Sequence, residues 1–497
     1  MAAPNQPVRK VTIVGGGTAG WMTAIAVKTA LPASAVELVE SDEIGIVGVG
    51  EATLPSIRDF HAQVGINEIE FLRATNATFK LGAEFRDWSG LGQRYFHTFG
   101  NYADVAGPAC LWGQYRRVGD PALGELGDQC VPTVMSIQGR FARPPNEQAD
   151  LYTYAYHFDA SLYAGFLRTT ALKRGVRRTE GRIVEVTRRA DGGVDQLKLA
   201  DGRTVSGDLF VDCSGFASLL LGRTLEEPWV DFSHWLPADR AWAVPSAPSG
   251  SAITPYTRST ALEAGWAWRI PLTDRVGNGH VFSTRYIDEE RAREQLLEQL
   301  DGPALAEPRL LRFTTGHRER FWVHNVVALG LASGFLEPLE STSIMLIQRG
   351  LLKMVDLLKP GVPPAAPAVA AYNRGMTNVF ARIRDFVVLH YCLTARRDSQ
   401  LWRDVTAMDL PDTLAFRLHV WRQTGVLRQY GEEGFEPASW LAIHSGNGNW
   451  PEHLDPVFNE VPLDEARQAL RQRRDQIAAM VATMPLHEDY LRGILGK

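Results

Sequence analysis

This sequence has few cysteines, no long apolar run and no excess of basic residues. Each of these features argues against a class of protein. The chain has 4 cysteines in 497 residues, without CxxC or Cys/His ligand spacing, so we predict neither a disulfide framework nor a metal site. No run approaches the roughly 18 apolar residues of a membrane-spanning helix. The segment MAAPNQPVRK also lacks the apolar stretch of a signal peptide. We therefore expect a cytoplasmic protein without a membrane span.

The charge balance is mildly acidic, with 52 Lys and Arg against 57 Asp and Glu. A chain of this kind lacks the basic surface that attracts polyanions. Its 45% share of hydrophobic residues is ordinary for a globular protein and suffices for a large core. Nucleic acid and anionic membranes are therefore excluded from the expected partners.

Hydrophobic patterns divide the chain into an α/β body and a helical C-terminal part. KVTIVG, AVELVE and DLFVDC are apolar runs typical of buried strands, and the segments 414–430 and 464–484 have the periodicity of amphipathic helices. Two segments rich in Pro, Gly and Ser, 246–255 and 359–368, are predicted to be loops. We predict an α/β body over residues 1–400 and a helical part over 401–497, fused into one compact unit.

The best conventional motif is GGGTAG, which follows the first apolar strand and opens a helix. This strand, turn and helix context is what the dinucleotide-binding sequence GxGxxG requires, because its glycines let a pyrophosphate approach the backbone at a helix N-terminus. An acid at the end of the next strand, about 20 residues on, is typical of a ribose contact. The residues that form this predicted site are Gly15, Gly17, Thr18, Ala19, Gly20 and Glu40. The motif alone does not choose between FAD and NAD.

A second motif, GWAWRIPL, places two tryptophans two residues apart in a predicted strand. Successive side chains of a strand alternate between its faces, so Trp266 and Trp268 point to one side. From this stretch alone, the two rings could be ordinary core aromatics or could form a wall against a ligand.

Several segments, taken in order, resemble the flavin-dependent tryptophan halogenase family over residues 9–405. The segments that carry the resemblance are GVGEAT, YHFDASLYAGFLR, DLFVDCSGF, LPADRAWAVP, GWAWRIPL, ASGFLEPLESTSI and RDFVVLHYCLTARRD. The resemblance implies an α/β fold with a Rossmann-like FAD-binding box of the aromatic-hydroxylase type and a helical C-terminal pyramid. It also implies FAD as the dinucleotide, with further contacts from Ala52, Leu331 and Ile344.

The resemblance gives the tryptophan motif a function. In the family the pattern Trp-x-Trp-x-Ile-Pro lies beside the flavin and keeps the organic substrate away from it, while a small halide still reaches it. The matching residues here are Trp266, Trp268, Ile270 and Pro271.

The resemblance also implies the reaction. FADH2 from a separate NADH-dependent reductase, O2 and a halide, bromide or chloride, give hypohalous acid, which Lys80 presents to the substrate while Glu340 takes the ring proton. The apolar neighbours of Lys80 predict a desolvated ammonium with a lowered pKa, whereas an arbitrary lysine would reach the surface. Glu337, in the same EPLEST segment, is expected to be structural.

The halide contacts implied by the resemblance are Thr342 and Ser343, and the second departs from the family pattern Glu-Ser-Thr-Gly. A Cβ at a position with unusual dihedrals would reshape the halide site, so we expect bromide to be accepted at least as readily as chloride. A helix N-cap made by Ser341 or Thr342 is the alternative for this segment.

The substrate expected from FHTFG is an indole-like or larger electron-rich arene, held by His97 and Phe99. Where the family carries a segment with paired tyrosines, a glutamate and Phe-Trp that grips tryptophan, this sequence reads SWLAIHSGNGNWPEHLDP; Trp450 is the substitute aromatic that we predict there. We therefore expect a substrate other than free tryptophan. The alternatives are a FAD-dependent aromatic monooxygenase and a catalytically inactive flavin- and aromatic-binding protein, and a homodimer stays open.

Overall fold

The computed structural model describes residues 8–44, 50–102, 105–145, 150–250, 252–359 and 364–496. The chain forms two compact units, and each combines three separate segments: residues 1–77, 158–237 and 312–381 make the first unit, and residues 78–157, 238–311 and 382–497 the second. The division at residue 400 that the sequence suggested stays a proposal.

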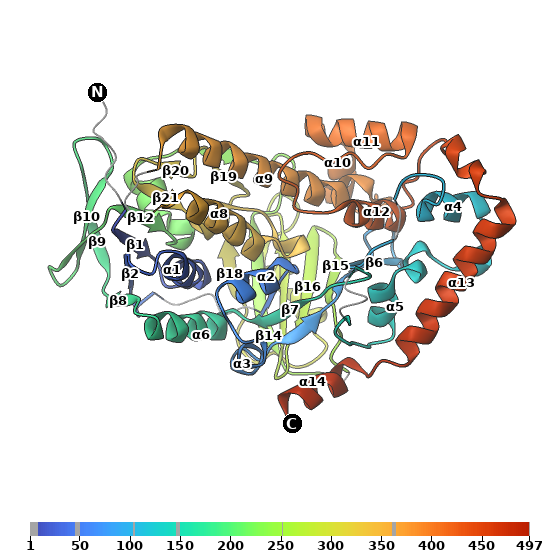
Figure 1. The fold of residues 1–497 in the computed structure, drawn as a ribbon, viewed down its shortest axis with the longest axis horizontal. Helices are drawn as coiled ribbons and strands as arrows, with labels where there is room; N and C mark the ends of the chain where they lie inside the picture. Colours follow the sequence, from blue (N-terminus) through green and yellow to red (C-terminus); the bar gives the residue numbers. More distant parts are fainter. Residues whose placement is uncertain are drawn as a thin grey trace. The chain divides into compact units, whose positions relative to one another are not determined.

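A six-stranded sheet in the order β20-β21-β12-β1-β2-β8 forms the centre of the first unit. The three apolar runs predicted to be strands are β1 (Lys10–Val14), β2 (Ala35–Glu40) and β12 (Leu209–Asp212), and β1 pairs in parallel with both others. Figure 1 shows these strands side by side, with α1 (Thr18–Ala30) next to them. Parallel strands joined through a helix are the expected dinucleotide-binding architecture.

Of the other strands of the first unit, β8, β20 and β21 complete this sheet, and β13, β19 and β22 form a separate three-stranded sheet. The strands are β3 (Gly50–Ala52), β8 (Arg177–Glu180), β13 (Trp229–Asp231), β19 (Gly316–Arg318), β20 (Trp322–Val323), β21 (Val326–Ala328) and β22 (Gly334–Phe335). The helices are α2 (Ser56–Gln63), α3 (Glu68–Ala74), α6 (Ala160–Lys173) and α8 (Ser343–Leu357).

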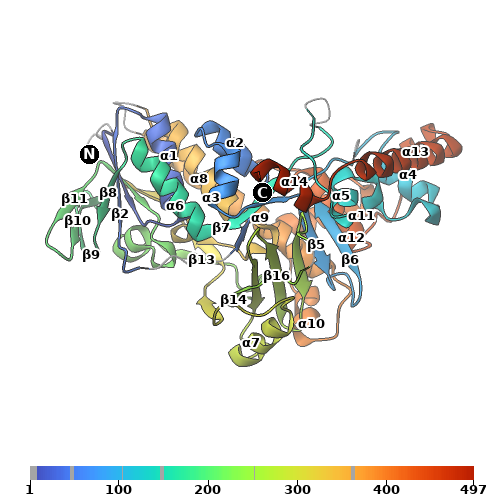
Figure 2. The same cartoon turned by 90° about the horizontal axis from the view of Figure 1, so that it is seen from below.

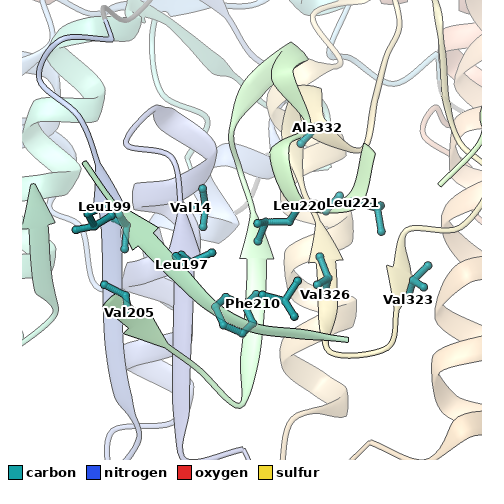
Figure 3. Close-up of a cluster of buried hydrophobic side chains, with 13 residues drawn as sticks. Val14, Leu197, Leu199, Val205, Phe210, Leu220, Leu221, Val323, Val326 and Ala332 are labelled. Carbon is teal, nitrogen blue, oxygen red and sulfur yellow. The ribbon is translucent and has the colours of Figure 1, made fainter. Parts of the chain in front are cut away.

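The core of the first unit lies where a smaller sheet packs on the large one. The three strands β9 (Ile183–Arg188), β10 (Val194–Leu199) and β11 (Thr204–Ser206) form an antiparallel sheet in the order β11-β10-β9. Its Leu197 and Leu199 are buried with Val14 and Phe210 of the central strands (Figure 3). This apolar layer fixes the strands whose carboxyl ends carry the glycine-rich turn.

A seven-stranded sheet in the order β18-β14-β17-β16-β15-β5-β6 forms the centre of the second unit. Its strands are β5 (Gly82–Arg86), β6 (Arg94–Thr98), β14 (Arg240–Ser246), β15 (Thr257–Ala261), β16 (Gly265–Pro271), β17 (Val276–Phe282) and β18 (Arg309–Arg312). Helix α7 (Glu289–Glu298) lies beside these strands in Figure 2. Trp242 donates to the carbonyl of Glu289 and His280 contacts the carbonyl of Ala292, so these side chains mark the face that α7 covers.

The predicted C-terminal helices are present in the second unit. They are α10 (Gln400–Ala407), α11 (Asp412–Thr424), α12 (Pro437–Gly446), α13 (Leu463–Ala482) and α14 (His487–Leu495), with α4 (Leu111–Val118) and α5 (Val131–Ile137) in the same unit. The prediction for 414–430 was too long, because Gly425 adopts a left-handed conformation with φ of 69° and ends α11. A buried cluster that includes Trp112, Trp421 and Phe458 joins α4, α11 and the segment before α13.

Helix α9 (Ala366–Leu393) begins inside the segment 359–368 that was predicted to be a loop. Pro367 lies in its first turn, where the missing N–H of proline has no cost. Residues 360–363 and Ser251 of the two predicted loops lie outside the described residues.

All four cysteines are free thiols. Within the described ranges, no three or more His, Cys, Asp or Glu side chains gather as metal ligands. The described helices include none with both the length and the apolarity to cross a bilayer.

Candidate active site

The glycine-rich turn of the first unit has the close backbone contacts that GxGxxG predicts. Gly15 adopts φ of 110°, and a Cβ there would lie 2.3 Å from the carbonyl oxygen of Cys213. A Cβ on Gly20 would lie 1.8 Å from the carbonyl oxygen of Gly15. A Cβ on Gly17, in contrast, would meet nothing within 4 Å. Gly15 and Gly20 are thus required by the fold, while Gly17 leaves space above the turn.

The N-terminus of α1 is open to an anion. Gly17 is its N-cap residue, no side chain caps it, and its first turn contains no acidic residue. The amides of the first helical turn lack partners within the helix, and the helix dipole places partial positive charge there. This end of α1 therefore fits the pyrophosphate of a dinucleotide.

Glu40 lies at the end of β2, as predicted for the ribose contact. Its Oε1 accepts a hydrogen bond of 2.6 Å from Arg178 Nε, and Arg168 Nη1 lies 3.8 Å from the same oxygen. Its Oε2 lies directly over Gly16, where a Cβ would come within 1.3 Å of it. The carboxylate is thus held by arginine on one side and reaches over the glycine turn on the other.

The other predicted cofactor residues belong to the same unit. Gly330 adopts φ of 64° and a Cβ there would lie 2.9 Å from Cβ of Ala19, so the turn that carries Leu331 packs on the start of α1. Ala52 and Ile344 are buried. Gly48 and Val49 of the GVGEAT segment lie outside the described residues. The cradle, the open helix end and the acid over the turn fit a bound FAD.

The segment that contains Glu340 leads into the N-terminus of α8. Glu340 is 3% exposed, Ser341 adopts a left-handed conformation with φ of 61°, and Thr342 is the N-cap residue of α8. The Thr342 hydroxyl makes no capping hydrogen bond and has no partner among the described residues. The N-cap residue Thr342 therefore gives this helix end no side-chain cap.

Ser343 does not adopt the unusual backbone conformation expected at its position. Ser343 is the first residue of α8 and is absent from the residues with positive φ, whereas Ser341 is among them. The unusual backbone conformation thus lies two residues earlier, and a Cβ at position 343 causes no strain in helical backbone. A dihedral-based effect of Ser343 on halide preference is not supported.

The tryptophan pair of the second unit lies on one face of the seven-stranded sheet, as the alternation of strand residues predicts. Trp266 and Trp268 are buried, with ring centroids 6.1 Å apart. Trp268 is in register with Ser259, which is in register with Phe85. The side chains that share this face, opposite to the one covered by α7, include Phe85, Tyr95, His97, Trp266, Trp268 and Ile270.

Lys80 lies in the short strand β4 (Thr78–Lys80), which pairs with β7 (Ala155–Asp159). It is 2% exposed, and its neighbours Phe79 and Leu81 are fully buried, so the apolar environment predicted from the sequence is present. Its Nζ lies 5.3 Å from the ring centroid of Phe99. Lys80 and Phe99, two of the predicted site residues, thus lie in contact.

A chain of hydrogen bonds ties β4 to the tryptophan strand. The Thr78 hydroxyl donates to the Pro271 carbonyl oxygen at 2.8 Å and therefore accepts from His157 Nδ1 at 3.0 Å. His157 Nε2 is then left to accept from the Thr257 hydroxyl at 3.0 Å. Burial, and next the positive charge of Lys80, hold the pKa of His157 well below its usual range, so this imidazole is neutral.

His97 is in an aromatic cluster that the sequence did not reveal. Its ring centroid lies 5.6 Å from that of Phe386 and 6.0 Å from that of Phe435. Phe386 and Phe435 stack at 3.9 Å, and Trp440 meets Phe386 edge-on. Phe386 belongs to the RDFVVLHYCLTARRD segment and Trp440 to the SWLAIHSG segment, but no local pattern marks either one as a neighbour of His97.

Trp450 lies elsewhere in the second unit. It packs against the cluster of Trp112 and Trp421, with Arg116 4.8 Å above its ring. Its predicted contact with substrate stays a prediction. Gly446 lies against β6, where a Cβ would come within 2.4 Å of the ring of Tyr95.

The parallel sheet, its glycine turn and the open helix end are typical of a dinucleotide-binding protein. Comparison with known proteins identifies the family: a sequence model of tryptophan halogenase matches residues 10–463, and the chain belongs to this family. It is 36% identical over 97% of both chains to a tryptophan 6-halogenase from Streptomyces toxytricini. It is 31% identical over 98% of both chains to a tryptophan 7-halogenase from Lentzea aerocolonigenes.

Solved structures agree with this assignment. A flavin-dependent halogenase from Xanthomonas campestris superposes with a TM-score of 0.95 at 44% identity, covering 98% of this chain and 99% of that one. A flavin-dependent halogenase from Brevundimonas sp. BAL3 gives a TM-score of 0.93 at 42% identity with the same coverage. The predicted family, the α/β fold class and the assignment as a flavin-dependent halogenase, an oxidoreductase, are confirmed.

Proposed function

We propose that this flavin-dependent halogenase transfers an oxidised halogen to an indole-like or larger electron-rich arene through Lys80. The observation that carries the proposal is the burial of Lys80 beside Phe99 on a strand hydrogen-bonded to the tryptophan motif. A buried ammonium among aromatic rings is poorly hydrated, so it binds a small polar oxidant strongly and in a fixed direction.

FAD supplies the oxidising chemistry when it is bound in its reduced form with O2 and halide. The residues proposed to hold it are Gly15, Gly17, Thr18, Ala19, Gly20, Glu40, Ala52, Leu331 and Ile344. The residues Trp266, Trp268, Ile270 and Pro271 are proposed to exclude the arene from the flavin, because the two large indole rings lie on one face of a buried strand. A separate NADH-dependent flavin reductase is the proposed source of reduced flavin.

The start of α8 is the proposed halide site. Backbone amides at the first turn of a helix are partial positive charges that bind anions, and the N-cap residue Thr342 does not cap this end with its side chain. The buried Thr342 hydroxyl adds a donor. Bromide is expected to serve at least as well as chloride, because it is less strongly hydrated and more easily oxidised.

Glu340 is the proposed base that takes the proton from the halogenated ring carbon. The side chain is buried, and its segment precedes the halide site by only two residues. Removal of this proton restores the aromatic ring after the halogen has added.

The proposed arene site contains His97 and Phe99, extended by Phe386 and Phe435. Flat aromatic neighbours favour a flat aromatic substrate. Streptomyces toxytricini and Lentzea aerocolonigenes relatives are named for tryptophan, but the segment 439–456 of this chain departs from the family segment that grips the amino acid. Indole is therefore the proposed minimal substrate.

The deciding experiment combines the protein with FAD, a flavin reductase, NADH, O2, bromide and an arene panel that includes indole. Mass spectrometry of the products should show the bromine isotope pattern, and omission of bromide should abolish it. Oxygenated products without bromine would favour a FAD-dependent aromatic monooxygenase. Flavin binding without any product would favour an inactive flavin- and aromatic-binding protein.

A further inference from the structure

The last helix of the chain begins at a histidine that contacts the lysine strand. His487 is fully buried, and its Nε2 accepts a hydrogen bond of 3.2 Å from the backbone N–H of Phe79, the residue before Lys80. Its Nδ1 lies 2.9 Å from the carbonyl oxygen of Ile253. One imidazole therefore bridges β4 and the segment before β15.

The amide of Phe79 needs such a partner. Strand β4 is the last strand of its sheet and pairs with β7 along one side only. Successive amides of a strand point to opposite edges, so alternate donors of an end strand have no ladder partner. Phe79 is fully buried, and a buried amide without a partner costs about 1 to 3 kcal/mol. His487 satisfies this donor beside the lysine.

The hydrogen bonds of His487 require one protonation state. Because Nε2 accepts from an N–H and Nδ1 donates to a carbonyl, the ring is neutral with its proton on Nδ1. Burial lowers the pKa of His487 to about 4, in agreement with this assignment. A proton on Nε2 would point toward the Phe79 N–H, and the hydrogen bond between them would be lost.

The backbone around His487 is docked independently of its side chain. The His487 N–H donates to the Gly139 carbonyl at 2.9 Å, and the Phe141 N–H donates to the Pro485 carbonyl at 3.2 Å. Phe141 stacks on Phe79 with centroids 4.2 Å apart, and Tyr490 meets both rings edge-on. These contacts fix the imidazole in place, so a change of its hydrogen bonds is transmitted to β4.

We propose that His487 is a positioning residue for Lys80, acting through the backbone of β4. The inference rests on the proposed function, in which Lys80 carries the oxidised halogen to the arene. Side chains that direct a reacting group must be held within about 0.5 Å of the productive position, and a misplacement of about 1 Å costs about 100-fold in rate. Loosening β4 then reduces transfer to the arene and leaves oxidation of the halide unaffected.

The test measures how oxidised bromide is divided between the arene and a soluble trap for hypobromous acid. His487→Phe keeps a ring but removes both hydrogen bonds, and His487→Gln keeps one donor and one acceptor. His280→Phe is the matched control, since His280 is equally buried, has a pKa lowered to about 4 and contacts α7 instead of β4.

We expect His487→Phe to lower kcat for the arene by about 10-fold or more, with little change in KM, while trapped hypobromous acid rises correspondingly. His487→Gln should restore a large part of the transfer, and His280→Phe should divide the oxidant as the wild-type protein does. A folded His487→Phe protein with the wild-type division contradicts the inference. The inference is also contradicted if His487→Gln transfers as little oxidised bromide to the arene as Lys80→Ala, the variant without the carrier lysine.

Two further measurements keep the outcomes separate. If His487→Phe does not fold, nitrogen NMR of wild-type protein labelled at histidine decides: a neutral ring with an unprotonated Nε2 is expected, and a protonated Nε2 overturns the inference. Lys80→Ala is assayed in parallel. If Lys80→Ala still halogenates the arene, the proposed function fails, whereas loss in Lys80→Ala without loss in His487→Phe refutes the role of His487 alone.

Discussion

The hydroxyl of Thr78 donates to the carbonyl oxygen of Pro271 at 2.8 Å, so the lysine strand and the tryptophan strand are joined directly. Thr78 lies two residues before Lys80, and Pro271 ends the strand that carries Trp266 and Trp268. The second unit thus holds the proposed halogen carrier and the proposed arene barrier in one hydrogen-bonded framework.

We expect Thr78→Val to weaken this framework. Valine keeps the volume of threonine but leaves His157 Nδ1 and the Pro271 carbonyl without their partner, and each buried orphan costs about 1 to 3 kcal/mol. Thermal unfolding should shift to lower temperature, and arene halogenation per folded molecule should fall. Thr75→Val is the matched control, because the buried Thr75 hydroxyl donates to Phe71 in the other unit. Equal losses of halogenation in both variants would show that the hydrogen bond between Thr78 and Pro271 has no specific role in halogenation.

Lys80→Ala should abolish arene halogenation and leave FAD binding intact, because the lysine lies in the unit without the dinucleotide cradle. Product formation is measured by mass spectrometry and FAD binding by flavin fluorescence. Lys198→Ala, which removes an exposed lysine paired with Glu185, serves as the control and should change neither. Product at near wild-type rates from Lys80→Ala would show that the lysine is not the carrier.

Gly17→Ala tests the dinucleotide cradle without disturbing the fold. A Cβ on Gly17 meets no protein atom within 4 Å, and its φ of -77° suits alanine, so the apoprotein should unfold near the wild-type temperature. The added methyl enters the space proposed for the pyrophosphate, and FAD affinity should fall by about 10-fold or more. Gly165→Ala in α6, also free of close contacts, should bind FAD normally. An unchanged affinity in Gly17→Ala would place the cofactor elsewhere.

Much of the fold and part of the site could be predicted because the relevant signals are local. The apolar runs became β1, β2 and β12, and period-two alternation correctly placed Trp266 and Trp268 on one face. The buried state of Lys80 also followed from its neighbours in the sequence, since a strand flanked by large apolar side chains is rarely exposed.

The rest depends on contacts between distant segments. His487 reaches Phe79 from 408 residues away, and Phe435 reaches His97 from a loop without any pattern of its own. The end of α11 is hidden from the sequence pattern because Gly425 lies inside a periodic run, although glycine in a left-handed conformation ends helices. The unusual backbone conformation expected at Ser343 lies instead at Ser341, which adopts φ of 61°. No pattern in the sequence distinguishes these two serines.

Glu340→Gln should reduce arene halogenation by about 100-fold, the usual scale for loss of a positioned general base. Glutamine keeps the volume and hydrogen-bonding shape of the side chain but cannot accept the ring proton. Glu337→Gln is the matched comparison, since Glu337 is equally buried in the same segment and is proposed to be structural. Steady-state rates per folded molecule are the measurement. Unchanged turnover in Glu340→Gln, or an equal loss in both variants, would leave Glu340 with a structural role only.

Competition between equimolar indole and tryptophan tests the proposed arene site and halide site together. The segment 439–456 is proposed to lack the family's grip on the amino acid, and its Gly446 lies against Tyr95. Burial of an ammonium and a carboxylate without paired partners costs several kcal/mol, whereas indole carries neither charge, so indole should be halogenated preferentially. The reaction is run once in bromide and once in chloride, and product masses give both preferences. Bromide should be used at least as readily as chloride, because the amides at the start of α8 bind either anion and bromide loses its hydration more easily. A clear preference for tryptophan would contradict the proposed arene site, and a strong preference for chloride would show that side chains around Thr342 select the smaller ion.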